Sequence, residues 1–323
     1  MDSGAELDRA RMRLLLSSVL VGLDTLRRTG ADLVLAHGNA STIHVAKVLS
    51  MLAFEMPRSE TEVASYMTPI IDGRAPRKGS SKPASIPDIR LPLVALPTLP
   101  CGGVESSPVV ALSDYDKERR LVLSAPELTP THVLVDPEAI ALDVTEAETE
   151  SKTGIFDARL LHFMAGREFA CALESSAAGS SDSLAYLQDA VSAWNEEDAA
   201  QIADVLCAQS IRMGKVFKSA QPIAPHEILA AALRDIAPIS FEEACGSLLE
   251  PSLRLLSEAH EGQPMAAEVG DIISSLPKPQ GLLAQGVIFD KEEHLKAAAQ
   301  AVDAATKGRL HCDRVLRVYE DAL

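Results

Sequence analysis

The pattern of hydrophobic and polar positions changes near residue 146. Before this point, helical periodicity alternates with short apolar runs of the kind that form buried parallel strands. The first helix is predicted over residues 7–29 and should end at Gly30, whose lack of a side chain suits a helix end. A strand is predicted over 31–36 and a second helix over 42–54. Further short strands are predicted at 93–96, 109–113, 121–124 and 132–135.

After residue 146 the strand signals disappear. The remaining sequence is rich in Ala and Leu at helical spacing and is interrupted by single prolines. Strands alternating with helices indicate a parallel sheet covered by helices, and an uninterrupted helical pattern indicates an all-helical unit. We therefore expect an α/β domain at 1–148 followed by an all-helical domain at 149–323.

The composition of the chain argues against nucleic acids and membranes as partners. The chain has 323 residues, with 30 Lys and Arg against 46 Asp and Glu, which gives a formal net charge of −16. A protein this acidic is repelled by phosphate backbones and by anionic membranes. Aromatic residues make up 4% of the chain, which leaves few platforms for base stacking. We expect a small-molecule substrate and neither a nucleic acid nor a membrane as partner.

Cysteine usage and targeting signals favour a cytoplasmic location. The five cysteines are widely spaced and form no C-x-x-C pair, which is typical of reduced thiols rather than of disulfides or a zinc site. No apolar run approaches the ~18 residues that a membrane span requires. The apolar stretch at 14–23 is followed by Asp24, Arg27 and Arg28 and lacks the small residues of a cleavage site, so it is interpreted as an amphipathic helix.

The turn after the first predicted strand has the pattern of an anion site. The strand at 31–36 leads into the sequence HGNAS at 37–41, and the next helix follows directly. A strand that passes through small residues into a helix presents backbone N–H groups to an anion at the helix N-terminus. The sequence therefore predicts that this turn can hold a phosphate group.

Several motifs, in a consistent order, resemble the iron-type (group III) alcohol dehydrogenase family, including its maleylacetate reductase branch. Residues 30–41 read GADLVLAHGNAS, where the family has GADLVIAIGGGS, and residues 42–47 continue with TIHVAK. The later matching segments are LPT at 96–98, G-x-E at 103–105, LVLSAPELTP at 121–130, DP at 136–137, TG at 153–154, APH at 224–226, LP at 276–277 and GV at 286–287. The resemblance implies the dehydroquinate-synthase-like fold, an α/β nucleotide domain plus a helical domain with the active site in the cleft between them.

The resemblance also implies where a nicotinamide cofactor would bind. The family's glycine-rich turn holds the cofactor pyrophosphate, because glycines let the backbone approach the phosphates. Of this turn the chain keeps only the first glycine, and Asn can take the left-handed conformation in its place. We therefore expect NAD(P) binding that is weakened rather than lost. The implied cofactor-binding residues are Gly38, Asn39, Ala40, Ser41, Thr98 and Gly103.

The family's metal ligands are largely replaced. Its first pair, an Asp and a His four residues apart, falls on Phe156 and Leu160, and the earlier of its two later histidine ligands falls on Arg212. The next histidine position of the family falls on Val216. Only His226 remains in register. A single histidine does not hold a catalytic divalent ion, so we expect no tightly bound metal.

A shifted alignment does not restore the metal site. It offers Asp157 with His162, five residues later. On a regular helix these side chains would lie about 140° apart, too far round for one ion.

The maleylacetate reductase branch works without this ligand set. The sequence PHE at 225–227 is closer to its PHAE than to the PHG of the alcohol dehydrogenases. Arg212, Lys215 and Lys218 stand where that branch has histidines; they can bind a carboxylate or form a solvated helix face. The residues expected to carry the chemistry are His226, Glu227, Asp157 and Arg212.

The chain also has fewer elements at its start than the family. The family begins with a strand, a helix and a second strand that carries the acidic residue for the adenosine ribose. Here a single helix is predicted before the strand at 31–36. We therefore expect the adenine end of a dinucleotide to lack its usual residues. The sequence leaves open whether the gene is shortened or the sequence is incomplete.

Three functional hypotheses follow from these motifs. The first is an oxidoreductase that reduces a ketone or keto acid with NAD(P)H and no metal, with His226 as the proton donor. The second is a repurposed enzyme without redox chemistry, an isomerase, lyase or cyclase. The third is a pseudoenzyme or binding subunit that forms a homodimer through an unpaired sheet edge. We favour the first hypothesis, and His37 and His44 are interpreted as packing residues.

Overall fold

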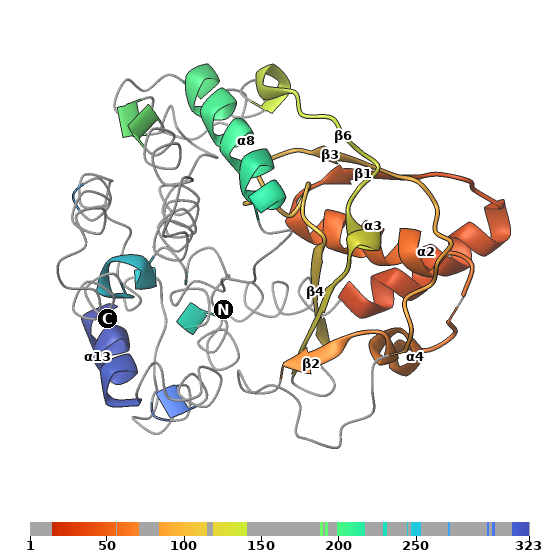
Figure 1. The fold of residues 1–323 in the computed structure, drawn as a ribbon, viewed down its shortest axis with the longest axis horizontal. Coiled ribbons are helices and arrows are strands. Elements are labelled where there is room, and N and C mark those ends of the chain that lie inside the picture. The colour runs from red at the N-terminus through yellow and green to blue at the C-terminus, as the bar shows by residue number, and fades with distance from the viewer. Residues whose placement is uncertain are drawn as a thin grey trace, which may run out of the picture. The chain divides into compact units, whose positions relative to one another are not determined.

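The computed structural model describes two compact units (Figure 1). The first comprises residues 1–136 and 210–220, and the second comprises 137–209 and 221–323. The description covers mainly residues 15–55, 57–70, 84–114, 119–140, 199–216 and 312–322, together with short pieces at 188–189, 191–192, 229–230, 244, 247–252, 271, 296 and 299–300. The sequence-based domain boundary at 148 falls outside these residues.

Helix α2 (Leu15–Thr29) opens the described part of the first unit. Leu16, Val19 and Leu23 recur at helical spacing and are buried, so they form the face that packs into the core. The helix ends at Gly30, which adopts φ +63° and donates its N–H to the carbonyl of Leu26 at 2.9 Å. The predicted end of this helix is confirmed, whereas its predicted start at residue 7 lies outside the described residues.

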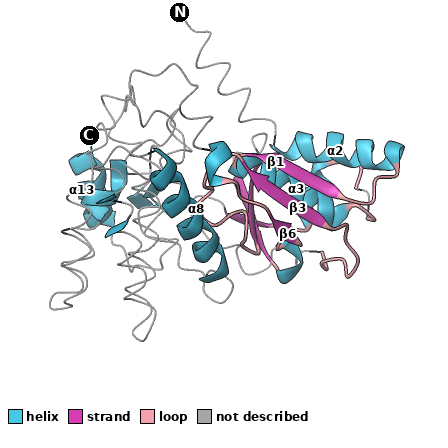
Figure 2. Cartoon of the chain, turned by 90° about the horizontal axis from the view of Figure 1, so that it is seen from above, coloured by secondary structure: helices cyan, strands magenta, loops and turns pink. Residues whose placement is uncertain are grey.

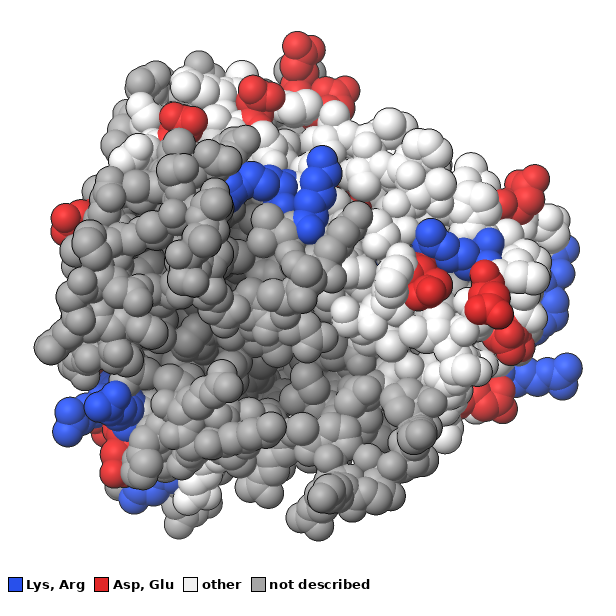
Figure 3. All heavy atoms as spheres, viewed as in Figure 1, with Lys and Arg blue, Asp and Glu red and all other residues white. Residues whose placement is uncertain are grey.

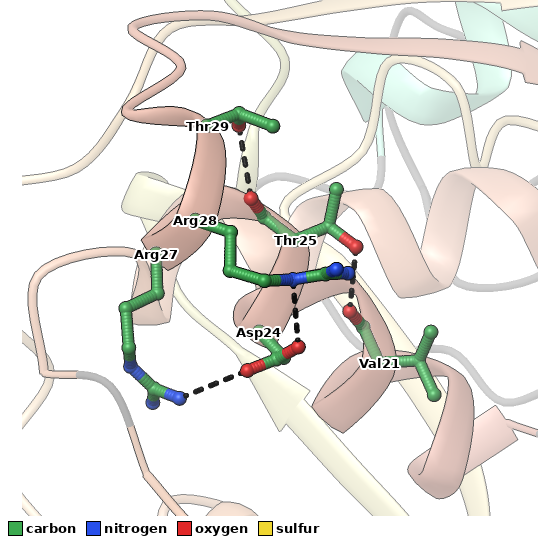
Figure 4. Close-up of polar contacts among 6 residues, drawn as sticks. All are labelled: Val21, Asp24, Thr25, Arg27, Arg28 and Thr29. Atoms are coloured by element: carbon green, nitrogen blue, oxygen red, sulfur yellow. Dashed lines mark hydrogen bonds and ion pairs between the residues drawn. The ribbon is translucent and has the colours of Figure 1, made fainter.

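The C-terminal half of α2 carries its own polar contacts on the exposed side (Figure 4). Asp24 pairs with Arg27 at 3.4 Å and with Arg28 at 3.0 Å, at helical spacings of three and four residues. All three side chains are largely exposed, so each pair stabilises the fold by only a few tenths of a kcal/mol. Packing of the apolar face therefore holds α2 in place.

A parallel sheet forms the centre of the predicted cofactor region. It contains β1 (Val34–Gly38), β3 (Leu93–Pro97) and β6 (His132–Val133), in the order β1-β3-β6. Strands were predicted at all three places, and both pairings are parallel as expected. Helix α3 (Ala40–Leu52) connects β1 to the rest of the domain and lies against β1 and β3, and α2 packs on α3 (Figure 2).

A second sheet in the same unit is antiparallel. It contains β2 (Thr68–Ile70), β5 (Arg119–Ser124) and β4 (Val109–Asp114), in the order β2-β5-β4. β4 and β5 are joined by residues 115–118 alone, a link too short for the crossover that a parallel pair needs. Strands were expected at the positions of β4 and β5, whereas β2 and the second sheet were not.

The two sheets enclose separate clusters of buried side chains. One cluster joins α2 and α3 to the antiparallel sheet through buried residues that include Val19, Leu52 and Leu121. The other lies between α3 and the parallel sheet and includes Ile43, Leu93 and Ala95. Helix α3 contributes to both clusters, which explains why seven of its thirteen residues are buried.

Three further helical elements lie outside the two sheets. Helix α4 (Glu60–Ser65) starts at Ser59, whose hydroxyl accepts the N–H of Glu62 at 3.2 Å, and the 3-10 helix η2 spans Pro126–Leu128. In the second unit, α13 (Cys312–Ala322) buries Tyr319, whose hydroxyl donates to the carbonyl of Leu229 at 2.9 Å. Within the described part of the chain, none of the helices is long and apolar enough to cross a membrane.

Candidate functional site

The turn after β1 is built around Gly38. This residue has φ +154°, and a Cβ atom placed on it would lie 2.5 Å from the side-chain oxygen of Thr42. A residue with a side chain would therefore meet both backbone strain and overlap with the first turn of α3. The glycine that the sequence analysis selected has a steric reason for being there.

Asn39 caps α3 rather than replacing a left-handed glycine. Its backbone is extended, with φ −80° and ψ −176°, and its Oδ1 accepts the N–H of Thr42 at 3.3 Å. This corrects the expectation that the asparagine adopts the left-handed region. The cap satisfies one of the helix's first N–H groups, while those of Ala40 and Ser41 have no acceptor within the helix, because a helix supplies none to its first residues.

The turns after β1 and β3 lie next to each other. In the parallel register Gly38 is opposite Pro97, so both strands end at the same edge of the sheet. The N–H of Thr98 donates to the carbonyl of Gly38 at 3.1 Å and ties the two turns together. In open parallel sheets, ligands bind beyond the carboxyl ends of the strands. The structure therefore brings together the two parts of the predicted cofactor site.

The second turn continues into a buried loop over residues 101–107. Gly102 and Gly103 have φ of +56° and +90°, conformations that disfavour any residue with a Cβ. The N–H of Gly103 donates to the hydroxyl of Ser210 at 2.9 Å. Gly103 therefore contributes to the site through the shape of the loop, since its N–H group already has a partner.

The last turns of helix α8 (Ala199–Val216) hold this loop from the other side. Besides the contact of Ser210, the hydroxyl of Ser106 donates to the carbonyl of Ile211 at 3.0 Å. Gly214 makes the approach possible, because a Cβ there would overlap Ser106 Oγ and the carbonyl of Gly103. Residues 210–216 belong to the same compact unit as the loop.

The third support of the loop is the side chain of Lys47 on α3. Lys47 is 1% exposed, and its Nζ donates to the carbonyls of Val104, Ser107 and Val109 at 2.5, 2.7 and 2.9 Å. An ammonium group has three N–H donors, and each has a carbonyl acceptor here. The buried charge is therefore fully hydrogen-bonded, as a charge inside a protein must be.

Burial shifts the titration of two charged groups in opposite directions. The loss of water around Lys47 lowers its pKa to about 7, an effect that the negative charges of Glu105 and Cys101 partly oppose. Burial raises the pKa of Glu105, and hydrogen bonds from Ser210 and the loop backbone together with the positive Lys47 counteract this rise. The interior of the domain thus holds a lysine and a carboxyl whose charged forms depend on each other.

The two histidines near the turn differ in their surroundings. His37 is exposed at the end of β1, immediately before Gly38. His44, one turn into α3, accepts the N–H of Ala111 of β4 through Nδ1 at 3.4 Å. His44 is therefore engaged in packing α3 on β4, in agreement with its interpretation as a packing residue.

One of the four catalytic candidates lies among the residues that the structure describes. Arg212 is half-buried on α8, in the segment that contacts the 101–107 loop. Asp157, Glu227 and His226 lie outside the described residues. The geometry therefore relates one of the four candidates to the cofactor turns and leaves the other three as predictions.

One of the family's metal-ligand positions, as the resemblance implies them, lies among the described residues. It falls on Arg212 of α8, whose guanidinium has no electron pair to donate to a metal, and the next histidine position of the family falls on Val216. Among the described residues, no group of three His, Cys, Asp or Glu side chains is close enough to share an ion. Phe156, Leu160 and His226 lie outside those residues.

Charge is dispersed over the face shown in Figure 3. Acidic and basic side chains of the described residues are interspersed there, so this part of the surface has no broad field of one sign. At the turn after β1, the groups that can attract an anion are the backbone N–H groups at the start of α3.

Sequence reasoning missed three residues that shape the site: Lys47, Ser210 and Gly214. Lys47 carried a signal, because it stands four residues after Ile43 and four before Met51, within the buried stripe of α3. A lysine in such a stripe needs internal acceptors. Ser210 lies 107 positions from its partner Gly103, and no local pattern could link the two.

Comparisons with known proteins agree with this geometry. The model of the iron-containing alcohol dehydrogenase family matches residues 5–137. No curated protein sequence matches the chain. Solved structures do, at 95% coverage of this chain.

Three of these structures illustrate the range of relatives. Sulfoacetaldehyde reductase from Bifidobacterium kashiwanohense, solved in complex with NAD+, is 18% identical, with a TM-score of 0.69 and 80% of its own chain covered. NADH-dependent butanol dehydrogenase A from Thermotoga maritima is 13% identical, with a TM-score of 0.66 and 80% covered. Maleylacetate reductase from Agrobacterium tumefaciens is 15% identical, with a TM-score of 0.65 and 78% covered.

The family match and the structural matches support the same assignment. The family match covers the sheet and both glycine-bearing turns, and the structural match extends over nearly the whole chain. The resemblance inferred from the sequence is thereby confirmed: the N-terminal part matches the iron-containing alcohol dehydrogenase family, and the chain has the fold of these dehydrogenases.

Proposed function

We propose that this protein binds a nicotinamide dinucleotide at the carboxyl ends of β1 and β3 and reduces a ketone or keto acid without a bound metal. The observation that carries the proposal is the pairing of the two turns, tied by the 3.1 Å hydrogen bond from Thr98 N to the carbonyl of Gly38. The match to a dehydrogenase family and the NAD+ complex of a structural relative support the same ligand class.

The residues present suit the pyrophosphate of such a cofactor. The N–H groups of Ala40 and Ser41 lack acceptors within α3, and the helix dipole places positive potential at the same point. Gly38 keeps the approach to these groups open, since any side chain there would collide with Thr42. When bound, the reduced cofactor supplies a hydride to the substrate carbonyl.

Two features explain why binding should be weaker than in a fully glycine-rich turn. Oδ1 of Asn39 occupies the N–H of Thr42, so a phosphate has to compete with an acceptor already in place. The N–H of Gly103 is likewise engaged, by Ser210. Each engaged donor removes one charge-assisted hydrogen bond that a phosphate could otherwise accept.

The substrate half of the proposal rests on the chemistry of the predicted residues. Arg212, on the α8 segment that holds the loop, can pair with the carboxylate of a keto acid in a bidentate manner. His226 is proposed to donate the proton to the developing alkoxide, with Glu227 and Asp157 as neighbouring acid–base groups. The arginine at one family ligand position, Arg212, favours chemistry without a metal.

Cofactor titration tests the first half directly. NADH and NADPH are titrated separately into the protein up to millimolar concentration, and binding is followed by nicotinamide fluorescence. We expect saturable binding of at least one of them and its loss in Gly38→Ala, whose side chain would overlap Thr42. Absence of binding by the wild type at millimolar concentration would refute the proposed cofactor.

Substrate reduction tests the second half. NADH or NADPH consumption is measured with a panel of keto acids and of the matching neutral ketones, before and after exhaustive chelation. We expect turnover that chelation leaves unchanged, and a larger loss in Arg212→Gln for the acids than for the ketones. Activity that disappears with the chelator and returns with a divalent metal would overturn the metal-independent mechanism.

A further inference from the structure

One buried side chain is linked to both halves of the proposed cofactor site. Lys47 lies two turns into α3, the helix whose N-terminus forms the first half. Its Nζ reaches the carbonyls of Val104 and Ser107, in the loop that follows Thr98 and forms the second half, and the carbonyl of Val109 at the start of β4. The same helix therefore presents the anion turn at its surface and anchors the second loop from inside.

We infer that Lys47 is a positioning residue for the cofactor site: its ammonium group fixes the 104–109 segment to α3 and thereby sets the spacing between the two turns. The inference rests on the proposed function, because the spacing matters only if one ligand occupies both turns. Lys47 itself does not contact the ligand, since it is 1% exposed.

Three carbonyl groups on one ammonium make the anchor specific. All three acceptors lie within 3.0 Å of Nζ, and the hydroxyl of Ser107 adds a longer contact at 3.4 Å. Removing the ammonium would take a donor from all three carbonyls, one of them in a buried contact and two in partly buried ones, and the loop would have to shift to offer them a replacement. A simple packing residue would leave no such polar groups behind.

The neighbouring elements add few other charged groups. Glu105 and Cys101, on the loop, act on Lys47 through their charges. On α3, His44 points to Ala111 of β4. Ser210, from α8, reaches Gly103 and hydrogen-bonds Glu105. Glu105 is therefore the described carboxyl whose charge affects Lys47.

The anchor should weaken as the pH rises. Burial lowers the pKa of Lys47 to about 7, so the side chain loses a proton over the neutral range. The neutral amine has two N–H donors for three carbonyls, so one of the three loses its hydrogen bond from Lys47. NADH affinity should therefore fall between about pH 6.5 and 8.5 in the wild type.

The test compares Lys47→Met with Met51→Ala. The first removes the ammonium and keeps the length of the side chain, and the second removes a fully buried side chain of the same helix in the cluster that faces the antiparallel sheet. Both should lower the Tm, so they are matched for general destabilisation. NADH is titrated between pH 6 and 9 into each variant, and amide hydrogen exchange is measured without NADH.

We expect Lys47→Met to lose about tenfold in NADH affinity at pH 6.5, the factor that corresponds to losing a hydrogen bond from a charged donor. The loss should shrink toward pH 8.5, and exchange should accelerate at residues 104–111. Met51→Ala should keep the affinity and the pH profile of the wild type. Wild-type affinity in Lys47→Met, or an equal loss in both variants, would overturn the inference.

Two further measurements cover the cases in which Lys47→Met does not fold or the wild type does not bind NADH. If Lys47→Met does not fold, the pH profile is measured in His37→Gln, which removes the exposed imidazole beside Gly38; an affinity that stays constant from pH 6 to 9 would then contradict the anchor. If the wild type does not bind NADH, the proposed function fails, while the exchange rates of residues 104–111 still report whether Lys47 holds the loop.

Discussion

The contact between α8 and the cofactor loop can be tested with a pair of glycine-to-alanine substitutions. Gly214→Ala places a Cβ where Ser106 Oγ and the carbonyl of Gly103 already lie, and 2.9 Å from the N–H nitrogen of Ser107. Gly22→Ala places a Cβ 2.7 Å from the two methyl carbons of Leu49. Both glycines are within helices, but one faces backbone atoms and the other faces the end of a flexible side chain.

The magnitudes follow from this difference. Replacing a helical glycine with alanine stabilises a helix by about 1 kcal/mol, and this gain cancels to first order between the two variants. Leu49 is only partly buried and can rotate away, so Gly22→Ala should be neutral or slightly stabilising. The loop backbone has to be displaced in Gly214→Ala, and overpacking of this kind costs about 1–3 kcal/mol. The free energy of unfolding should therefore be lower in Gly214→Ala than in Gly22→Ala by about 1–3 kcal/mol.

Urea unfolding measures the difference, and NADH titration measures its functional consequence. We expect Gly214→Ala to bind NADH more weakly than the wild type, because Gly103 and Ser106 move with the loop, whereas Gly22→Ala should bind it normally. Equal free energies of unfolding in the two variants would refute the close packing of α8 on the loop. A lower free energy of unfolding in Gly214→Ala with unchanged NADH affinity would show that this packing does not affect the cofactor site.

Three further predictions concern single groups. Asn39→Gly should raise NADH affinity severalfold in fluorescence titration, because it frees the N–H of Thr42, at a cost of only a few tenths of a kcal/mol in the free energy of unfolding; unchanged affinity would show that Asn39 does not compete with the ligand. Ser59→Ala should lower the free energy of unfolding by about 1 kcal/mol in urea, through loss of the α4 cap, and Ser85→Ala at an exposed position serves as the control. The free energy of unfolding of the wild type relative to Lys47→Met should rise between pH 7 and 10, by up to about 1.4 kcal/mol per pH unit, because the folded lysine has a pKa near 7 and the unfolded one near 10.5, so the unfolded state binds more protons in this window; a difference that falls with pH would contradict the lowered pKa.

Local patterns were sufficient for the parallel sheet. The apolar runs at 31–36, 93–96 and 132–135 lie where β1, β3 and β6 form, and Gly30 ends α2 as predicted. Each of these signals depends on residues within a few positions. The small-residue turn after β1 was recognisable for the same reason, since strand, turn and helix follow directly in the sequence.

Pairing and long-range contacts were harder to predict. The strands β4 and β5 contain short apolar runs like those of the parallel strands, and the short link at 115–118 is the signal for an antiparallel hairpin. The role of Asn39 was also misjudged, because capping and the left-handed conformation favour the same residue type. The contacts of Lys47 and Ser210 with the loop span 57 to 107 positions and become apparent only in the folded chain.

The central claim is that one dinucleotide occupies the two turns at the carboxyl ends of β1 and β3. Amide hydrogen exchange with and without saturating NADH or NADPH measures this directly. The account predicts slower exchange in the peptides that cover residues 38–42 and 98–103, and little change in α2 or α4. Binding accompanied by protection elsewhere, with both turns exchanging as in the free protein, would contradict it.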